Sequence, residues 1–200
     1  YIGLELASMY ARYGSQVTVF ELNERLVGRE DEDVALEIQH ILENQGVQFK
    51  FKSRVQEVSN QNEKAVIHYS QDETRYIDRF DAILLATGRS ANTADLGLEN
   101  TGVQMNERGQ IIVNEYLQTD VPHIYAMGDV KGGLQFTYIS LDDFRIVFNY
   151  LTGDGSYNLE TRGAVPTAMF LNPPLAQVGL TEDQARAAGG PVAVKELPVA

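Results

Sequence analysis

The sequence predicts an α/β fold with a central parallel sheet and an antiparallel meander. Helical and strand-like segments alternate over the first 50 residues, short alternating runs follow, and one continuous apolar run later has the length of a strand. Apolar residues make up 44% of the 200 residues, which is enough to bury a substantial core. The chain can therefore hold one large or two small globular domains.

The first part of the chain follows the order of a βαβ unit. Apolar residues recur at helical spacing over residues 2 to 12, and Gly14 is expected to end that helix. Residues 16 to 21 (QVTVFE) are β-branched and aromatic, which is typical of a strand. A second helix is predicted from Asp31, where acidic residues crowd the first turn, to Gly46.

Two kinds of strand are expected next. Residues 47 to 52, 64 to 69 and 74 to 77 are short alternating runs between polar turns, and they predict an antiparallel meander. Residues 81 to 87 (DAILLAT) form a continuous apolar run that ends at Gly88, the pattern of a strand buried on both faces. This run predicts that the chain returns to the central sheet.

The last third of the chain contains two predicted helices. Residues 124 to 127 form a second buried-strand candidate before a helix predicted over 139 to 151, and the polar residues 152 to 163 indicate a domain boundary. A strand is expected over 167 to 171. Thr181, with Gln184 three residues later, predicts a capping box at the start of the final helix.

Composition excludes several classes of function. The 28 acidic and 16 basic residues give a net charge of −12, which opposes binding to nucleic acid or anionic lipid. No cysteine is present, and three scattered histidines leave few ligands for zinc. No apolar run reaches the roughly 18 to 20 residues that span a bilayer, so we expect a soluble, cytoplasmic protein whose start at Tyr1 is a cut end.

The acidic residues 30 to 33 and the pair Asp142-Asp143 are interpreted as solvated charge. The first run lies where a helix N-terminus attracts carboxylates, and the pair lacks the spacing of a cation-binding loop. No metal site is predicted from either.

A partial dinucleotide-binding fingerprint lies near the start of the chain. Such a turn needs glycines beside the pyrophosphate and an acidic residue about 20 positions further on for the ribose hydroxyls. Gly3 lies one turn into the first predicted helix, where the third glycine belongs, and Glu21 follows at close to that distance, at a strand end. A helix-packing glycine and a surface glutamate are the alternative interpretation.

Four motifs occur in a fixed order along the chain. They are Tyr1-Ile2-Gly3-Leu4-Glu5, Ala86-Thr87-Gly88-Arg89 with Asn92-Thr93, Tyr125-Ala126-Met127-Gly128-Asp129-Val130, and residues 173 to 182 (PPLAQVGLTE). In this order the chain resembles the class I pyridine nucleotide-disulfide oxidoreductases, which include dihydrolipoamide dehydrogenase, glutathione reductase and mercuric reductase. Residues 132 to 143 (GGLQFTYISLDD) are most similar to the bacterial reactive-chlorine resistance flavoproteins, a mercuric-reductase-like branch.

The resemblance implies Rossmann-like FAD- and NAD(P)-binding domains. Residues 1 to 80 would belong to the NAD(P)-binding domain without its first strand and glycines, and residues 81 to 155 to the C-terminal part of the FAD-binding domain. Residues 164 to 200 would begin an α+β dimerisation domain, which implies a homodimer.

The resemblance also implies roles for residues of the NAD(P)-binding domain. Tyr1 would be an aromatic gate over the flavin, and Glu5 would pair with a lysine beside the isoalloxazine ring. Glu21 would bind the adenosine ribose and repel a 2′-phosphate, which favours NADH, although Arg25 could soften that preference. Val55 would contact the adenine, and a strand core residue is its alternative role.

The flavin-binding residues implied by the resemblance lie in the second half of the chain. Gly88 would let the backbone approach the nicotinamide ribose, with Arg89 beside it. Asp129 would bond a ribityl hydroxyl of FAD. Backbone groups at the start of the following helix would approach the flavin pyrimidine, at Gln135, Phe136 and Thr137.

The implied reaction is a relay from NADH to FAD, then to a dithiol, and then to a final acceptor, with NADPH as a possible second donor. The acceptor would be a disulfide, a metal ion such as copper or mercury, or a reactive oxidant. In the family, the cysteine pair lies N-terminal to the matched residues and a partner-subunit histidine lies C-terminal to them. Two alternatives remain open at this point: a flavin reductase or oxidase without a redox dithiol, and a nucleotide-binding module without catalysis.

Overall fold

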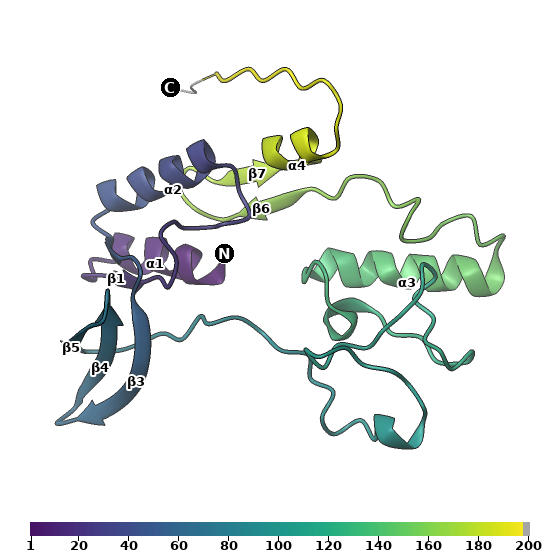
Figure 1. Ribbon diagram of the computed structural model, residues 1–200, viewed down its shortest axis with the longest axis horizontal. Coiled ribbons are helices and arrows are strands. Elements are labelled where there is room, and N and C mark those ends of the chain that lie inside the picture. Colours follow the sequence, from purple (N-terminus) through teal and green to yellow (C-terminus); the bar gives the residue numbers. More distant parts are fainter. Residues whose placement is uncertain (198–200) are drawn as a thin grey trace. The chain divides into compact units, whose positions relative to one another are not determined.

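The computed structural model describes residues 1–197, which form two compact units (Figure 1). Unit 1 contains residues 1–86 together with the residues from 166 onward, and unit 2 contains residues 87–165. The sequence placed its domain boundaries near residues 80 and 155 to 164, and these remain predictions. None of the helices in the described part of the chain is long and apolar enough to cross a membrane.

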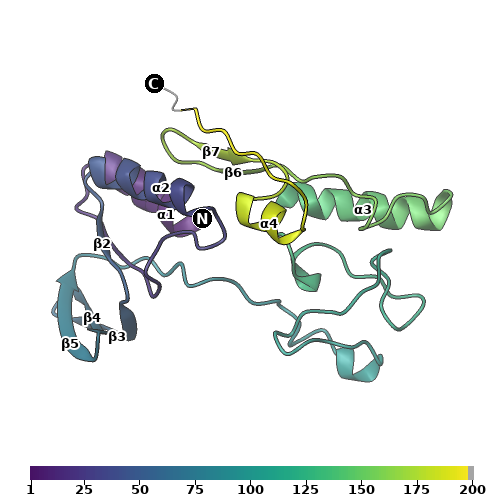
Figure 2. The same cartoon turned by 45° about the horizontal axis from the view of Figure 1, so that its top comes forward.

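Two helices provide much of the core of unit 1. Helix α1 (Ile2–Arg12) and helix α2 (Glu32–Asn44) match the predicted positions and lie side by side in Figures 1 and 2. Gly14 and Gly46 follow them with positive φ, as expected of residues that end helices. Their buried faces join one apolar cluster with residues from far along the chain: Leu4, Ala7, Leu26, Ile38, Leu42, Val47, Met169 and Leu171.

A parallel pair of strands confirms the predicted βαβ connection around α2. Strand β1 (Thr18–Phe20) pairs with β2 (Gln48–Lys50) in parallel, with Val19 opposite Phe49. The prediction that residues 47 to 52 begin the meander was wrong. These residues continue the parallel sheet because α2 returns the chain to the same end of β1.

The antiparallel meander has three strands in the order β3-β4-β5. Strands β4 (Lys64–Gln71) and β5 (Thr74–Phe80) were predicted, whereas β3 (Arg54–Gln61) was not. Most side chains of β3 are polar and exposed, so the strand lacks the alternation that predicts a half-buried strand. Its pairing with β4 shifts between Val55 and Glu57.

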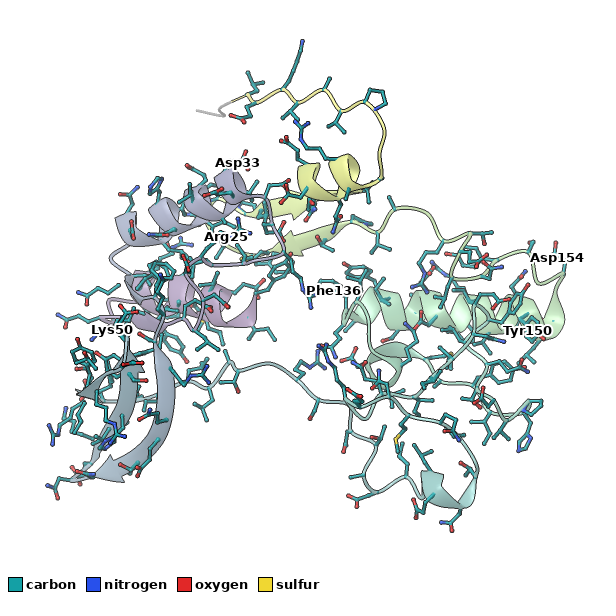
Figure 3. The ribbon with its side chains drawn as sticks, viewed as in Figure 1. Arg25, Asp33, Lys50, Phe136, Tyr150 and Asp154 are labelled. Atoms are coloured by element: carbon teal, nitrogen blue, oxygen red, sulfur yellow. The ribbon has the colours of Figure 1, made fainter. Side chains whose placement is uncertain are left out.

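Lys50 joins the parallel pair to the meander (Figure 3). Its ammonium group lies 2.6 Å from Asp78 Oδ2 and 2.6 Å from the Tyr69 hydroxyl, and 5.7 Å from the centre of the Phe20 ring. Burial alone would lower the pKa of Lys50, but the bonds to Asp78 and Tyr69 raise it overall. The parallel pair and the meander are therefore joined by a cation that lies among aromatic rings and a carboxylate.

Residues 167–187 add a hairpin and a short helix to unit 1. Strands β6 (Thr167–Met169) and β7 (Leu175–Gln177) are antiparallel, and α4 (Glu182–Ala187) follows. The predicted capping box between Thr181 and Gln184 is confirmed in both directions. The carboxylate of Asp31, the N-cap residue of α2, also accepts the backbone N–H groups of Glu182 (2.8 Å) and Asp183 (3.2 Å).

Unit 2 is organised around helix α3 (Thr137–Thr152), which confirms and extends the predicted helix. Two short 3₁₀ helices, η1 (Leu98–Asn100) and η2 (Gly128–Lys131), lie in the irregular chain before it. Small apolar clusters pack around Ile111 and Ala126 and around Leu117 and Ile146.

Two predicted strands do not form. Residues 81–87 are extended without a strand partner, and Leu84 and Leu85 are 48% and 71% exposed. Residues 124–127 make a single bridge, between Tyr125 and Gln118, although Ala126 is buried. Both segments have the apolar composition of a strand. A strand also needs a neighbouring strand to pair with, and within the described residues neither segment has one.

We expect the core position Leu42 to be far more sensitive than an exposed position on the same helix. Leu42 is 0% exposed, so Leu42→Ala removes buried methyl groups and should lower the free energy of unfolding by about 2–5 kcal/mol. Leu36→Ala is the control, because Leu36 is 46% exposed; its effect should be below about 1 kcal/mol. Urea unfolding followed by circular dichroism measures both. Equal effects would contradict the assigned core.

Candidate functional site

Gly3 lies where α1 packs against the extended chain before Gly88. A Cβ atom at this position would lie 3.1 Å from Cβ of Ala86, which is tighter than ordinary contact. The glycine therefore allows the close approach between helix and chain that the third glycine of a dinucleotide fingerprint provides. This is also the geometry of a helix-packing glycine, so packing alone does not separate the two interpretations of Gly3.

Glu21 lies directly after β1, at the carboxyl end of the parallel pair. Its Oε1 accepts hydrogen bonds from the backbone N–H (2.8 Å) and the side-chain amide (2.7 Å) of Asn23. Within residues 1–197, no donor is bonded to Oε2. The carboxylate is thus oriented by one oxygen, and the other remains available for donors such as the two hydroxyls of a ribose.

Val55 lies two residues after Ser53, whose backbone is bonded to Glu21. The N–H of Ser53 donates to the carbonyl oxygen of Glu21 at 2.9 Å, and the N–H of Glu21 donates to Lys50 at 3.0 Å. The Val55 side chain is 42% exposed, so Val55 is not a core residue of the strand. An exposed apolar side chain of this kind is suited to contact a planar base.

Tyr1 is the N-cap residue of α1 and Glu5 lies in its first turn, and both side chains are bonded within unit 1. The Tyr1 hydroxyl donates to Glu30, which is buried despite its predicted solvation. Burial and the bond to Glu30 raise the pKa of Tyr1 to about 12. Glu5 Oε1 accepts the N–H of Phe170 at 2.9 Å, so this carboxylate is tied to the end of β6.

In unit 2, the structure brings Arg89 and Asp129 together. The Arg89 guanidinium forms an ion pair with Oδ2 of Asp129, and the side chains are 51% and 36% exposed. The neighbouring Gly88 has φ +104°, and a Cβ there would meet nothing within 4 Å. A partly exposed carboxylate therefore lies beside a cation and an open stretch of backbone.

The turn at Gly128 needs glycine for two reasons. Its φ is +71°, and a Cβ would lie 2.7 Å from the Ser140 hydroxyl oxygen, so the turn is pressed against α3. The residues Gln135, Phe136 and Thr137 lead into α3, with Phe136 as N-cap and its ring stacked on Tyr138 at 5.2 Å. Figure 3 shows Phe136 at the start of α3, with Tyr150 and Asp154 toward its other end.

The interpretation of Asp142 and Asp143 as solvated charge was wrong. Asp143 is 0% exposed and forms an ion pair with Arg162, and its Oδ2 lies 3.3 Å from the ammonium group of Lys131. Arg162 Nε lies 2.6 Å from Asp142 Oδ2. Burial alone would lower the pKa of Arg162, but the two carboxylates raise it. The only sequence signal was a basic residue in the polar stretch after α3, which gives no partner.

The sequence-predicted residues fall into two groups. Unit 1 contains Tyr1, Gly3, Glu5, Glu21 and Val55, and the backbone of Glu21 is bonded to Ser53, two residues before Val55. Unit 2 contains Gly88, Arg89, Asp129 and residues 135 to 137, of which Arg89 and Asp129 are in contact. Within residues 1–197, no group of three or more His, Asp or Glu side chains is arranged to hold a metal ion.

Comparison with known proteins shows which proteins this chain is similar to. Probable pyridine nucleotide-disulfide oxidoreductase RclA of Escherichia coli is 46% identical over 200 residues, which is all of this chain and 44% of that protein. Mercuric reductase of Staphylococcus aureus is 36% identical (100% of this chain and 36% of that protein). Dihydrolipoyl dehydrogenase of Bacillus subtilis is 37% identical (98% and 42%). The chain thus spans less than half the length of these relatives.

The fold agrees with the same relatives. The solved Cu(II) complex of the HOCl-induced flavoprotein disulfide reductase RclA from Escherichia coli superposes with a TM-score of 0.86 at 45% identity, over 94% of this chain and 42% of that one. Residues 1–143 match the family described as pyridine nucleotide-disulphide oxidoreductase, and residues 165–200 match its dimerisation domain. The chain therefore belongs to the pyridine nucleotide-disulphide oxidoreductase family.

Proposed function

We propose that this chain is part of an FAD-dependent oxidoreductase that takes electrons from NADH and delivers them, through a dithiol, to a final acceptor. Members of the family depend on FAD and use NAD(P)H. The observation that carries the proposal is the position of Glu21 at the carboxyl end of the parallel pair, with Gly3 packed closely against Ala86. Dinucleotides bind outside the carboxyl ends of strands in sheets of this kind.

The residues of unit 2 fit a flavin. Asp129 offers a partly exposed carboxylate that can accept a bond from a ribityl hydroxyl, and Arg89 holds one of its oxygens. The turn at Gly128 lies so close to Ser140 that a side chain would not fit, so Asp129 follows a turn that packs against the beginning of α3. The backbone N–H groups of Gln135, Phe136 and Thr137 would face the flavin pyrimidine, where a helix N-terminus favours negative charge. Bound FAD would supply two-electron transfer between NADH and a disulfide.

The choice between NADH and NADPH would depend on Glu21. Its Oε1 is held by Asn23, and its Oε2 would accept a ribose hydroxyl, whereas a 2′-phosphate would meet a negative charge. Val55 would contact the adenine, and Gly88 would allow the backbone to approach the nicotinamide ribose. Arg25 is half-buried two residues after Asn23 and would soften the preference.

Tyr1 and Glu5 would act where hydride is transferred. Tyr1 would cover the flavin until the nicotinamide displaces it, and its bond to Glu30 would hold the ring in a defined resting position. Glu5 would pair with a lysine of the flavin domain, and its second bond to the Phe170 N–H would keep the carboxylate oriented.

The redox dithiol would come from residues outside this chain, which contains no cysteine. The acceptor would be a disulfide, a metal ion or a reactive oxidant, and one relative has been solved as a Cu(II) complex. The dimerisation-domain match over residues 165–200 supports a homodimer. The net charge of −12 opposes a nucleic-acid or anionic-membrane partner, and we propose a cytoplasmic location.

The test is an anaerobic titration of the intact polypeptide that contains these residues, first with NADH and then with NADPH. We expect NADH to bleach the flavin absorbance and a long-wavelength thiolate-to-flavin charge-transfer band to appear. Bleaching without that band would indicate a flavin reductase or oxidase that lacks the dithiol step. The relatives, which are disulfide reductases by name, do not favour that alternative. A protein without bound flavin would overturn the proposal.

Replacing Glu21 should shift the coenzyme preference. In Glu21→Ala, the lost bonds to the ribose and the lost repulsion of a 2′-phosphate should lower the ratio of kcat/KM for NADH over NADPH by about 10-fold or more. Glu24→Ala is a matched control, because Glu24 is three residues away and is paired with Lys52 at 3.4 Å. Steady-state kinetics with both coenzymes measures the ratio. An unchanged ratio in Glu21→Ala would remove Glu21 from the coenzyme site.

Titration of Tyr1 should report its bond to Glu30. The pKa of Tyr1 is raised to about 12 from 10, so the neutral phenol is favoured in the folded protein. The contribution of this phenol to stability is therefore complete below pH 10 and is lost as the pH rises toward 12. Glu30→Gln should lower the pKa of Tyr1, and Glu24→Gln should leave it unchanged. The ¹³Cζ resonance of labelled tyrosine, assigned with Tyr1→Phe, follows the titration; a wild-type midpoint near pH 10 would contradict the contact.

A further inference from the structure

A group of buried charges lies directly behind the turn that carries Asp129. It consists of two carboxylates from α3 and two cations from outside that helix: Asp142, Asp143, Lys131 and Arg162, which we call the charge cluster. The Lys131 side chain is 8% exposed, the Arg162 side chain 12%, and the Asp143 side chain 0%. Two negative and two positive charges are thus neutralised within unit 2, away from solvent.

The carboxylate of Asp143 holds both ends of η2. Its Oδ2 accepts the N–H of Gly128 at 2.8 Å and lies 3.3 Å from the ammonium group of Lys131. Gly128 and Lys131 are the first and last residues of η2, and Asp129 lies between them. The backbone directly before Asp129 and the side chain of Lys131 after it are therefore both held by one buried carboxylate.

The other oxygen of Asp143 connects this turn to a distant part of the chain. Oδ1 accepts the guanidinium of Arg162, which also lies 2.6 Å from Asp142 Oδ2. Tyr157 donates its hydroxyl to Asp142 Oδ1 at 2.8 Å. The segment that follows α3 is therefore tied to the helix through Asp142 and Asp143, but only Asp143 reaches η2.

Stability alone does not explain a carboxylate at this position. Buried ion pairs contribute little net stability compared with apolar side chains of similar size, because desolvation of the charges offsets their attraction. The turn contains Gly128 with φ +71°, a conformation that glycine adopts without strain, so contacts of its backbone such as the bond to Asp143 decide how firmly the turn is held. A group that fixes such a turn beside Asp129 is suited to hold the Asp129 carboxylate in one orientation.

We infer that Asp143 is a positioning residue for the flavin site, acting through the Gly128 N–H to aim the Asp129 carboxylate at the ribityl chain. The inference rests on the proposed function, since it assigns Asp129 to FAD. Asp142 shares the cluster and the helix but touches neither Gly128 nor Lys131, so it has a structural part in the cluster and no part in positioning Asp129.

The experiment compares the FAD affinities of variants of the intact holoenzyme. Apoprotein is reconstituted with FAD, and binding is followed by quenching of free-flavin fluorescence, with thermal unfolding of each apoprotein measured alongside. Asp143→Ala should raise the dissociation constant for FAD by about 10-fold or more, the effect of one lost bond to a charged group. Asp142→Ala should change it by less than about threefold, even where both apoproteins lose similar thermal stability.

Two further variants make the test specific. Asp143→Asn keeps an oxygen that can accept the Gly128 N–H, and should restore part of the affinity lost in Asp143→Ala. In an Asp129→Ala background, Asp143→Ala should weaken FAD binding by less than about threefold, because a positioning residue has no effect once the group it positions is gone. If Asp143→Ala does not fold, Asp143→Asn replaces it in the same cycle. Its smaller weakening of FAD binding is then expected to disappear in the Asp129→Ala background.

Three outcomes would overturn the inference. Equal weakening by Asp143→Ala and Asp142→Ala, or independent effects of Asp129→Ala and Asp143→Ala, would leave Asp143 with a structural role only. Tight FAD binding by Asp143→Ala would do the same, while the proposed function would stand. A wild-type protein that binds no FAD would overturn the proposed function itself, and this is seen before any variant is made.

Discussion

Unit 1 depends on burying apolar side chains that are far apart in the sequence. Met169 ends β6 and Leu171 lies two residues later. Both pack in the same cluster as Leu4 of α1 and Leu42 of α2. Each fully buried side chain of this size contributes about 1.5–3 kcal/mol, so the cluster outweighs any single polar contact around it. The side-chain amide of Gln45, at the end of α2, also donates to the Asn172 carbonyl oxygen (2.9 Å), which joins the same two segments. Gly3 and Glu5 lie on α1 and Glu21 directly follows β1, so the positions of these predicted site residues depend on this core.

Local signals explain which parts of the fold were predictable. The helices, their glycine ends and the capping box at Thr181 depend on residues within a few positions of each other, and all were predicted correctly. Strands depend on partners. Residues 81–87 have the composition of a buried strand but lie unpaired and exposed, whereas β3 is polar and exposed and still pairs along its length.

The same distinction applies to the site. Glu21 was predicted from its distance to Gly3 in the partial dinucleotide fingerprint, and Asp129 from an ordered motif; the structure has Glu21 directly after β1 and Asp129 in η2. Asp143 was misread because its partner Arg162 comes from a polar stretch that carries no pattern. A carboxylate pair on a helix looks the same in sequence whether it faces solvent or a buried arginine. Only the tertiary structure decides between these two environments. Here both acids pair with a largely buried arginine, whereas solvated side chains were expected.

Unit 2 is inserted into unit 1, since residues 87–165 separate the two stretches that build the core of unit 1. During synthesis on the ribosome, α1, α2 and the meander emerge well before Met169. At a typical rate of 5–20 residues per second, this interval is on the order of ten seconds. During that interval the apolar faces of α1 and α2 lack Met169 and Leu171, while all of unit 2 is translated and can fold. The incomplete unit 1 therefore exposes apolar surface during this interval, to which chaperones can bind. The order of translation also favours folding of unit 2 before unit 1 is complete.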